Sequence, residues 1–165
     1  MHDQEASRMV EITVEALMTA TDEVRALIEE LDSTLAREYR AEQRHGLSLD
    51  EVLQPHVRFF VARLDGVAVG CGGVALFDTF GELKRMYVRE AARGRGIARA
   101  LLTRIELETK NSGLDMLYLE TGDRQLDALR LYERAGFQKC VAFGQYASMT
   151  PHAIATSVFL KKRLT

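Results

Sequence analysis

The sequence predicts a single-domain α/β protein with a mixed, mostly antiparallel central sheet flanked by helices. Apolar residues alternate with polar ones in some segments and recur every three or four residues in others, in the order β-α-α-β-β-β-α-β-α-β-β. The 165 residues suffice for one sizeable core, and the two prolines mark no linker. No internal repeat or low-complexity segment divides the chain, so we expect one domain over residues 1–165.

The first third of the chain predicts one strand and two helices. Residues 10–14 alternate Val-Glu-Ile-Thr-Val and predict an opening strand. From about Thr21, apolar residues recur at helical spacing, and either Thr21 or Asp22 would serve as the N-cap of the helix. A second, short helix is expected after Ser48 or Asp50, and it must end before Pro55 because the residue preceding a proline avoids helical backbone angles.

The middle of the chain predicts three strands, over residues 57–64, 67–77 and 82–88. Asp65-Gly66 separates the first two, and this dipeptide between two β-rich segments is typical of a tight hairpin turn. Three glycines, at positions 70, 72 and 73, weaken the second strand. They indicate a bulge or the close approach of another backbone segment.

The last third alternates between the two kinds of element. Helices are expected over residues 97–110 and 125–135, and strands over residues 116–120, 137–142 and 156–162. A helix between two strands predicts a crossover connection and therefore a parallel strand pair.

Charge and composition argue against several classes of function. With 22 basic and 24 acidic residues the net charge is −2, so nothing drives the whole chain toward nucleic acid or an anionic membrane. Cys71 and Cys140 form neither a disulfide framework nor a metal-binding pattern. Residues 1–5 lack the basic start of a secretory signal, and the uncharged segment 140–160 is too polar for a spanning helix. We therefore expect a cytoplasmic protein without metal.

The segment Arg93-Gly94-Arg95-Gly96-Ile97-Ala98-Arg99 is the candidate binding site for a phosphate or pyrophosphate. Glycines allow consecutive N–H groups to point into one concavity, and the following helix adds its free N–H groups and the positive end of its dipole. The P-loop pattern is absent, and Arg99 stands where a dinucleotide fingerprint needs a third glycine or alanine. A merely solvated basic loop is the alternative.

Two motifs resemble the GNAT superfamily of N-acetyltransferases. Arg93-x-x-Gly96-x-Ala98 is similar to its Gln/Arg-x-x-Gly-x-Gly/Ala signature. Residues 128–137, Ala-Leu-Arg-Leu-Tyr-Glu-Arg-Ala-Gly-Phe, resemble its Ala-x-x-Leu-Tyr-x-x-x-Gly-Phe segment. The element order is also similar, so the resemblance covers nearly the whole chain and implies a GNAT-like fold. Residues 119–122, Leu-Glu-Thr-Gly, together with Gln125 resemble a bacterial subgroup of small stand-alone members.

The resemblance implies acetyl-CoA as cosubstrate, with its pyrophosphate on the N–H groups of residues 93–99. The pantetheine arm would pair like an extra strand along residues 86–88, in a wedge where this strand splays from the one at 116–120. The Val88 N–H would polarise the thioester carbonyl. Gln125 stands where the superfamily often has asparagine, which puts the geometry of that contact in doubt. The expected cofactor-binding residues are Met86, Tyr87, Val88, Arg93, Gly94, Arg95, Gly96, Ile97, Ala98, Arg99, Gln125, Ala128 and Tyr132.

Three side chains are expected to be catalytic. By the same resemblance, Tyr132 would protonate the leaving thiolate, although its helical spacing alone also fits a core tyrosine. A carboxylate must accept the proton of the acceptor amine, directly or through water. Glu82 is the first candidate, unless it is only a solvated strand residue. Glu120 on the opposing strand is its competitor, or else orients the acceptor.

The sequence suggests an acceptor only through its charge distribution. Residues 21–51 carry nine acidic residues and four arginines, and would attract a cationic amine such as a polyamine, an aminoglycoside or a protein lysine. Ordinary helix surface charge is the alternative. On the opposite lip, Tyr146 and His152 are candidates for acceptor contacts, whereas His45 and both cysteines are taken as structural.

These inferences predict an N-acetyltransferase that moves an acetyl group directly to a primary amine through a ternary complex, without a covalent acyl-enzyme. A catalytically silent acyl-CoA-sensing or protein-binding module on the same fold is the alternative, and an acyltransferase for longer acyl groups is a third possibility. Residues 158–160 would either mediate a homodimer or belong to the core.

Overall fold

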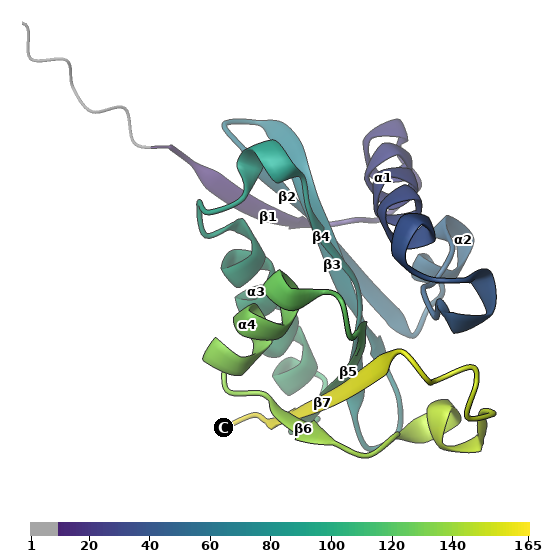
Figure 1. The fold of residues 1–165 in the computed structure, drawn as a ribbon. Helices are drawn as coiled ribbons and strands as arrows, with labels where there is room; N and C mark the ends of the chain where they lie inside the picture. Colours follow the sequence, from purple (N-terminus) through teal and green to yellow (C-terminus); the bar gives the residue numbers. More distant parts are fainter. Residues whose placement is uncertain (1–9) are drawn as a thin grey trace, which may run out of the picture.

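A single mixed sheet of seven strands crosses the centre of the molecule (Figure 1). A computed structural model describes residues 10–165; residues 1–5, for which the sequence predicts no signal peptide, lie outside that range. The strands are β1 (Ile12–Ala16), β2 (Val57–Leu64), β3 (Val67–Leu76), β4 (Gly81–Val88), β5 (Met116–Gly122), β6 (Gln138–Cys140) and β7 (Ser157–Arg163). They lie in the order β1-β2-β3-β4-β5-β7-β6, and every neighbouring pair is antiparallel except β4 and β5. The predicted fold class is therefore confirmed.

Helices cover both faces of this sheet. The helices are α1 (Asp22–Glu38), α2 (Leu49–Val52), α3 (Ile97–Asn111) and α4 (Leu126–Arg134), with short 3₁₀ turns η1 (Ala41–Gln43), η2 (Glu90–Ala92) and η3 (Gly144–Ser148). Figure 1 shows α1 and α2 on one side of the strands, and α3 and α4 on the other. Within the described part of the chain, no helix has the length and apolar composition needed to cross a bilayer.

Local signals placed the helix starts and the hairpin correctly. The Thr21 side chain accepts a hydrogen bond from the Val24 N–H, as expected of the N-cap of α1. Ser48 and Glu51 form a reciprocal capping box at α2. Asp65 and Gly66 both have positive φ angles, +48° and +85°, which is the backbone of a tight hairpin turn.

Strand ends differ from the expectation where pairing decides them. β1 begins and ends two residues later than predicted, because its partners on β2 run from Leu64 to Phe60. β5 extends two residues further, to Gly122, because Ser157 of β7 pairs with it there. β6 is shorter than expected, since only its three residues pair with β7. These limits depend on partner strands far away in the sequence.

The predicted bulge is present in β3, where Val69 is the extra residue opposite Ala62 and Arg63 of β2. A second bulge has its extra residue in β4. Cys71 pairs with Tyr87 and Gly73 with Lys84, so that two residues of β4 oppose the single residue between them on β3. Arg85, one of those two, has a φ of +55°. The close backbone approach is also real, because a Cβ on Gly73 would lie 2.6 Å from the Arg58 carbonyl oxygen.

The core has one layer on each face of the sheet. Ile97, Leu101 and Ile105 of α3 are buried against the apolar side chains of the central strands. On the other face, α1 and α2 pack over Phe59 and its neighbours. Leu160 of β7 is fully buried, so it belongs to the core rather than to a free surface.

β4 and β5 diverge after a short parallel contact. Only Gly81 and Glu82 pair with β5, opposite Leu117 and Tyr118. The remainder of β4 keeps β3 on one edge and leaves its other edge without a strand partner among the described residues. The expected wedge is therefore present.

Candidate active site

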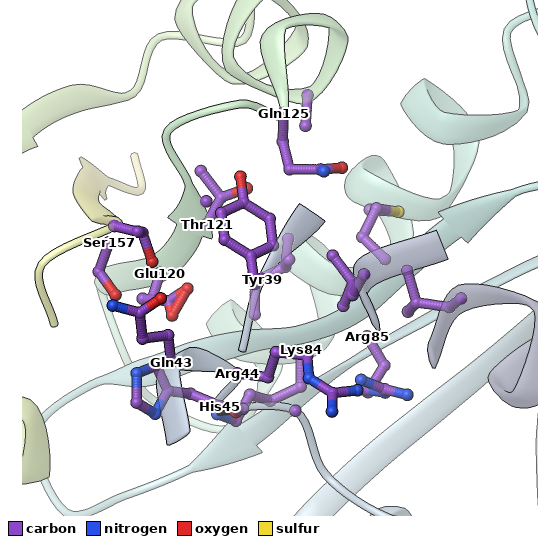
Figure 2. A pocket seen from close by; sticks show the side chains of 18 of the residues that line it. Tyr39, Gln43, Arg44, His45, Lys84, Arg85, Glu120, Thr121, Gln125 and Ser157 are labelled. Carbon is purple, nitrogen blue, oxygen red and sulfur yellow. Dashed lines mark hydrogen bonds between the residues drawn. The ribbon is translucent and has the colours of Figure 1, made fainter. Parts of the chain in front are cut away.

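A pocket lies in the wedge between β4 and β5. Figure 2 shows side chains from α1, the loop after it, β4, β5 and the start of α4 pointing toward one space. Six predicted site residues line it: Glu82, Met86, Glu120, Gln125, Ala128 and Tyr132. These residues come from three segments of the sequence, and the wedge brings them together.

Two other predicted residues, Tyr87 and Val88, do not line this pocket. Tyr87 packs toward the α1–α2 side of the sheet, and Val88 is buried in the layer under α3. The orientation of the Val88 backbone is compatible with its predicted role, which stays a prediction. Because the Arg89 N–H donates to Val69 on β3, and successive N–H groups of a strand point to opposite edges, the Val88 N–H faces the open edge of β4.

The loop before α3 has the backbone expected of an anion cradle. Gly94 and Gly96 have φ angles of +79° and +82°, and a Cβ on either would meet nothing within 4 Å. Gly96 is the N-cap of α3 and offers no side chain to the first N–H groups of the helix. Arg93 is partly engaged, since its Nε donates to the Val88 carbonyl at 3.0 Å. The loop lies outside the wedge pocket, and together the two would accommodate an elongated ligand.

The Tyr132 hydroxyl has no hydrogen-bond partner among the described residues, although the side chain is 4% exposed. Burial raises the pKa of this hydroxyl well above its ordinary value of 10.0, so it stays protonated. Tyr132 belongs to the core under α4, as its helical spacing predicted, and it also lines the pocket, whereas its role as proton donor stays a prediction.

Glu82 is held in a buried polar cluster. Its Oε2 accepts a hydrogen bond of 2.6 Å from the Tyr146 hydroxyl and forms an ion pair of 2.9 Å with Lys84 Nζ. Lys84 also donates to the Tyr146 hydroxyl at 3.0 Å and to the His45 carbonyl at 3.2 Å. Glu82 is only 2% exposed, so it is not a solvated strand residue.

Glu120 lies across the wedge without an ion-pair partner among residues 10–165. Its half-buried carboxyl has a pKa raised from 4.5 to about 7, chiefly because burial disfavours the charged form. The Lys84 charge opposes this shift, and the Glu82 charge adds to it. Glu120 is thus poised to exchange a proton near neutral pH.

The acidic segment does not present its charge to the pocket. Carboxylates of α1 pair with arginines of the sheet, as Glu23 does with Arg63, Glu30 with Arg89 and Asp32 with Arg85. The part of this segment that lines the pocket supplies Leu31, Leu35, Tyr39, Gln43, Arg44, His45 and Gly46, and so no carboxylate. The ordinary alternative, charged helix surfaces, describes this segment better than an acidic lip.

Sequence reasoning did not place Lys84 or Arg44 at the pocket, and it took His45, which also lines the pocket, as structural. The sequence predicted Lys84 only as part of the strand over residues 82–88, with no sign that it faces a buried carboxylate. His45 Nε2 lies 2.8 Å from the Ala153 carbonyl oxygen, and its ring packs edge-on against Tyr146. His152, in contrast, is exposed and contacts only Glu42 on the surface.

The two cysteines show no nucleophilic arrangement. Burial raises the pKa of Cys71 to about 12, and its Sγ lies 3.5 Å from the Arg85 carbonyl oxygen. Burial also raises the pKa of Cys140. In the described ranges, no group of three or more His, Cys, Asp and Glu side chains is placed to hold a metal ion.

Comparisons with known proteins agree with this geometry. The Acetyltransferase (GNAT) family profile matches residues 22–137. A protein of Azospirillum brasilense named IAA acetyltransferase is 43% identical over 159 residues, covering 94% of this chain and 100% of that protein. A solved structure from Klebsiella pneumoniae, ascribed to an acyl-CoA N-acyltransferase, is 32% identical with a TM-score of 0.78, over 93% of this chain and 98% of that one. The PaiA N-acetyltransferase of Thermoplasma acidophilum, solved in complex with coenzyme A, shares the fold at 18% identity and a TM-score of 0.68, over 92% and 99% of the two chains.

Proposed function

The chain belongs to the acetyltransferase (GNAT) family, and on this premise we propose that it transfers an acetyl group from acetyl-CoA directly to a primary amine. The observation that carries the proposal is the wedge pocket. There a protonated tyrosine and a carboxyl group with a pKa near 7 line one space, beside the open edge of β4. The acceptor is a small molecule or a protein side chain, and a cytoplasmic location and a homodimer stay predictions from the sequence.

The residues present fit acetyl-CoA. The open, positive-φ backbone at Gly94 and Gly96, the free N–H groups of α3 and the arginines at 93, 95 and 99 suit a pyrophosphate. The unpaired edge of β4 at residues 86–88 suits an amide-bearing arm, with Gln125 and Ala128 at the side of the pocket. Acetyl-CoA would supply an acetyl group activated as a thioester. The Val88 N–H, which faces the open edge, would hold the thioester carbonyl oxygen.

Glu120 is the proton acceptor in this proposal. An acceptor amine must lose a proton to form an amide, and a base works best when its pKa lies near the working pH. Glu120 meets this condition, with a pKa of about 7 and an unpaired carboxyl in the pocket. Glu82 is already engaged by Lys84 and Tyr146, so we assign it to positioning these two groups.

Tyr132 is the proton donor. Its side chain is among those that line the pocket, and burial keeps its hydroxyl protonated. A thiolate leaving group needs a proton, and a nearby neutral hydroxyl supplies it. Because neither cysteine is arranged as a nucleophile, transfer proceeds directly from donor to acceptor within one ternary complex.

Binding and turnover together test the proposal. The melting temperature is measured with acetyl-CoA, coenzyme A and NADP in separate titrations. A ligand at one hundred times its dissociation constant stabilises a protein by about 2.7 kcal/mol. We expect stabilisation by the first two ligands alone, followed by thiol release when amine acceptors are added. Binding without thiol release across polyamines, aminoglycosides, amino acids and lysine peptides would favour the silent acyl-CoA-sensing module instead.

A further inference from the structure

Arg44 lies in the wedge pocket without a charged partner. It follows η1, lines the pocket and forms no ion pair with any described carboxylate. Its Nε is buried and has no hydrogen-bond partner within residues 10–165. Arg44 as a whole is half-buried. A guanidinium group that is partly removed from water is usually paired, because an uncompensated cation loses hydration there. An unpaired one at a pocket wall therefore points to a ligand that brings an anion.

The two neighbouring cations, Lys84 and Arg85, differ from Arg44 because each forms an ion pair with a carboxylate. Lys84 is paired with Glu82, and Arg85 is paired with Asp32. Arg85 nevertheless also keeps a buried Nε without a partner, and its side chain is 4% exposed. Figure 2 shows the three cationic side chains gathered in one part of the pocket, apart from Glu120. This part of the pocket carries a positive charge that its own carboxylates do not balance.

The position of Arg44 separates it from the expected pyrophosphate site. Figure 1 shows the segment between α1 and α2 on the opposite side of the sheet from the start of α3. The loop before α3 already carries three arginines. Arg44 therefore lines the pocket from the side of the sheet away from the expected pyrophosphate site, and the acceptor is the ligand that it would meet there.

The missing anion fits a carboxylate. A guanidinium group presents parallel N–H donors that match the two oxygens of a carboxylate. One cation lacks a partner here, and a carboxylate brings a single negative charge. A phosphomonoester brings about −1.5 to −2 at neutral pH and would leave the pocket with excess negative charge.

We infer that the acceptor carries a carboxylate beside its amine, as an amino acid does, and that Arg44 binds this carboxylate with Arg85 beside it. The inference rests on the proposed function, since it names the substrate class of the same site. It replaces the cationic amines that the acidic segment suggested.

The experiment compares L-amino acids with the matching L-amino acid amides, which keep the amine and lack the carboxylate. Wild type should acetylate at least one acid with a kcat/KM about 10- to 100-fold above that of its amide, as expected for a charge-assisted hydrogen bond. Arg44→Gln should remove this preference by lowering the value for the acid alone. Arg40→Gln, at an exposed arginine just before η1, is the matched control and should keep it. Melting curves with acetyl-CoA verify that each variant is folded and binds its donor.

Calorimetric titration of the same acids and amides separates the two hypotheses. Acid binding that depends on Arg44, in a protein that transfers no acetyl group, would support the carboxylate site and overturn the proposed function. Acetyl transfer to amides as efficiently as to acids would overturn the inference and leave the proposed function standing. The inference would also be overturned if Arg44→Gln lowered kcat/KM equally for acid and amide, or if no acid bound to the wild-type protein.

Discussion

Replacing Glu120 by glutamine should stabilise the protein at pH 8 and slow acetyl transfer. The carboxyl has a pKa of about 7 in the folded protein and 4.5 as its ordinary value, which also represents the unfolded chain. The folded state therefore holds this proton more tightly. The stability that this group contributes is present below pH 4.5 and is lost as the pH rises to about 7. One pKa unit corresponds to about 1.4 kcal/mol, so ionised Glu120 costs about 3 kcal/mol at pH 8.

Glutamine keeps the shape of the side chain and removes this cost. For a chain of this size, 1 kcal/mol changes the melting temperature by about 2–4 °C. Because the amide must itself be accommodated, we expect Glu120→Gln to recover part of the cost and to melt about 4–8 °C above wild type at pH 8. The difference should vanish at pH 4.5. Glu133→Gln, at an exposed glutamate on α4, should show no such trend.

Thermal melts between pH 4.5 and 8 test this expectation, and turnover measured on the same samples tests the base. General bases contribute about 10²- to 10⁴-fold, so kcat should fall in that range, and the rise of wild-type kcat with an apparent pKa near 7 should disappear. A stability difference between variant and wild type that does not change with pH would refute the reasoning about Glu120. So would a variant that is less stable than wild type at pH 8.

Three further substitutions have defined outcomes. Gly96→Ala should lose about 1 kcal/mol of stability, because the φ angle of Gly96 is +82°, and calorimetry should show weaker acetyl-CoA binding. The control Gly66→Ala, at a φ angle of +85° in the hairpin turn, should lose similar stability and leave acetyl-CoA binding unchanged. Lys84→Met should lower the free energy of unfolding, measured with denaturant, by about 3–5 kcal/mol, because it leaves the buried Glu82 carboxylate uncompensated. Adding Glu82→Gln should restore part of this loss. Strictly additive losses of unfolding free energy in the two single variants would contradict the ion pair. Tyr132→Phe should lower kcat about 100-fold with little change in melting temperature, since no protein hydrogen bond is lost, whereas unchanged turnover would remove Tyr132 from the mechanism.

Structural features that depend on interactions within a few residues were predicted well. The Thr21 cap, the Asp65-Gly66 turn and the positive-φ glycines before α3 each depend on local backbone chemistry. The element order is likewise a matter of local periodicity. The exact strand ends were not predictable, because β1 and β5 stop where β2 and β7 stop pairing with them.

The charges of the site were predicted poorly because they are settled by distant partners. Tyr146 lies 64 residues from Glu82 in the sequence, and Arg85 lies 53 residues from Asp32. Nothing in the local pattern indicates that the acidic residues of α1 face arginines of the sheet, or that Arg44 forms no ion pair with a carboxylate of residues 10–165.

By itself, the sequence determined the elements, their order, the glycine-rich loop and the set of candidate site residues, since these depend on side chains and backbone angles of near neighbours. The tertiary structure decided which carboxylate and which cation of the pocket lack an ion-pair partner among the described residues. Both depend on desolvation and on the distance between charges, and these exist only once the sheet has brought β4, β5 and the segment after α1 around one pocket.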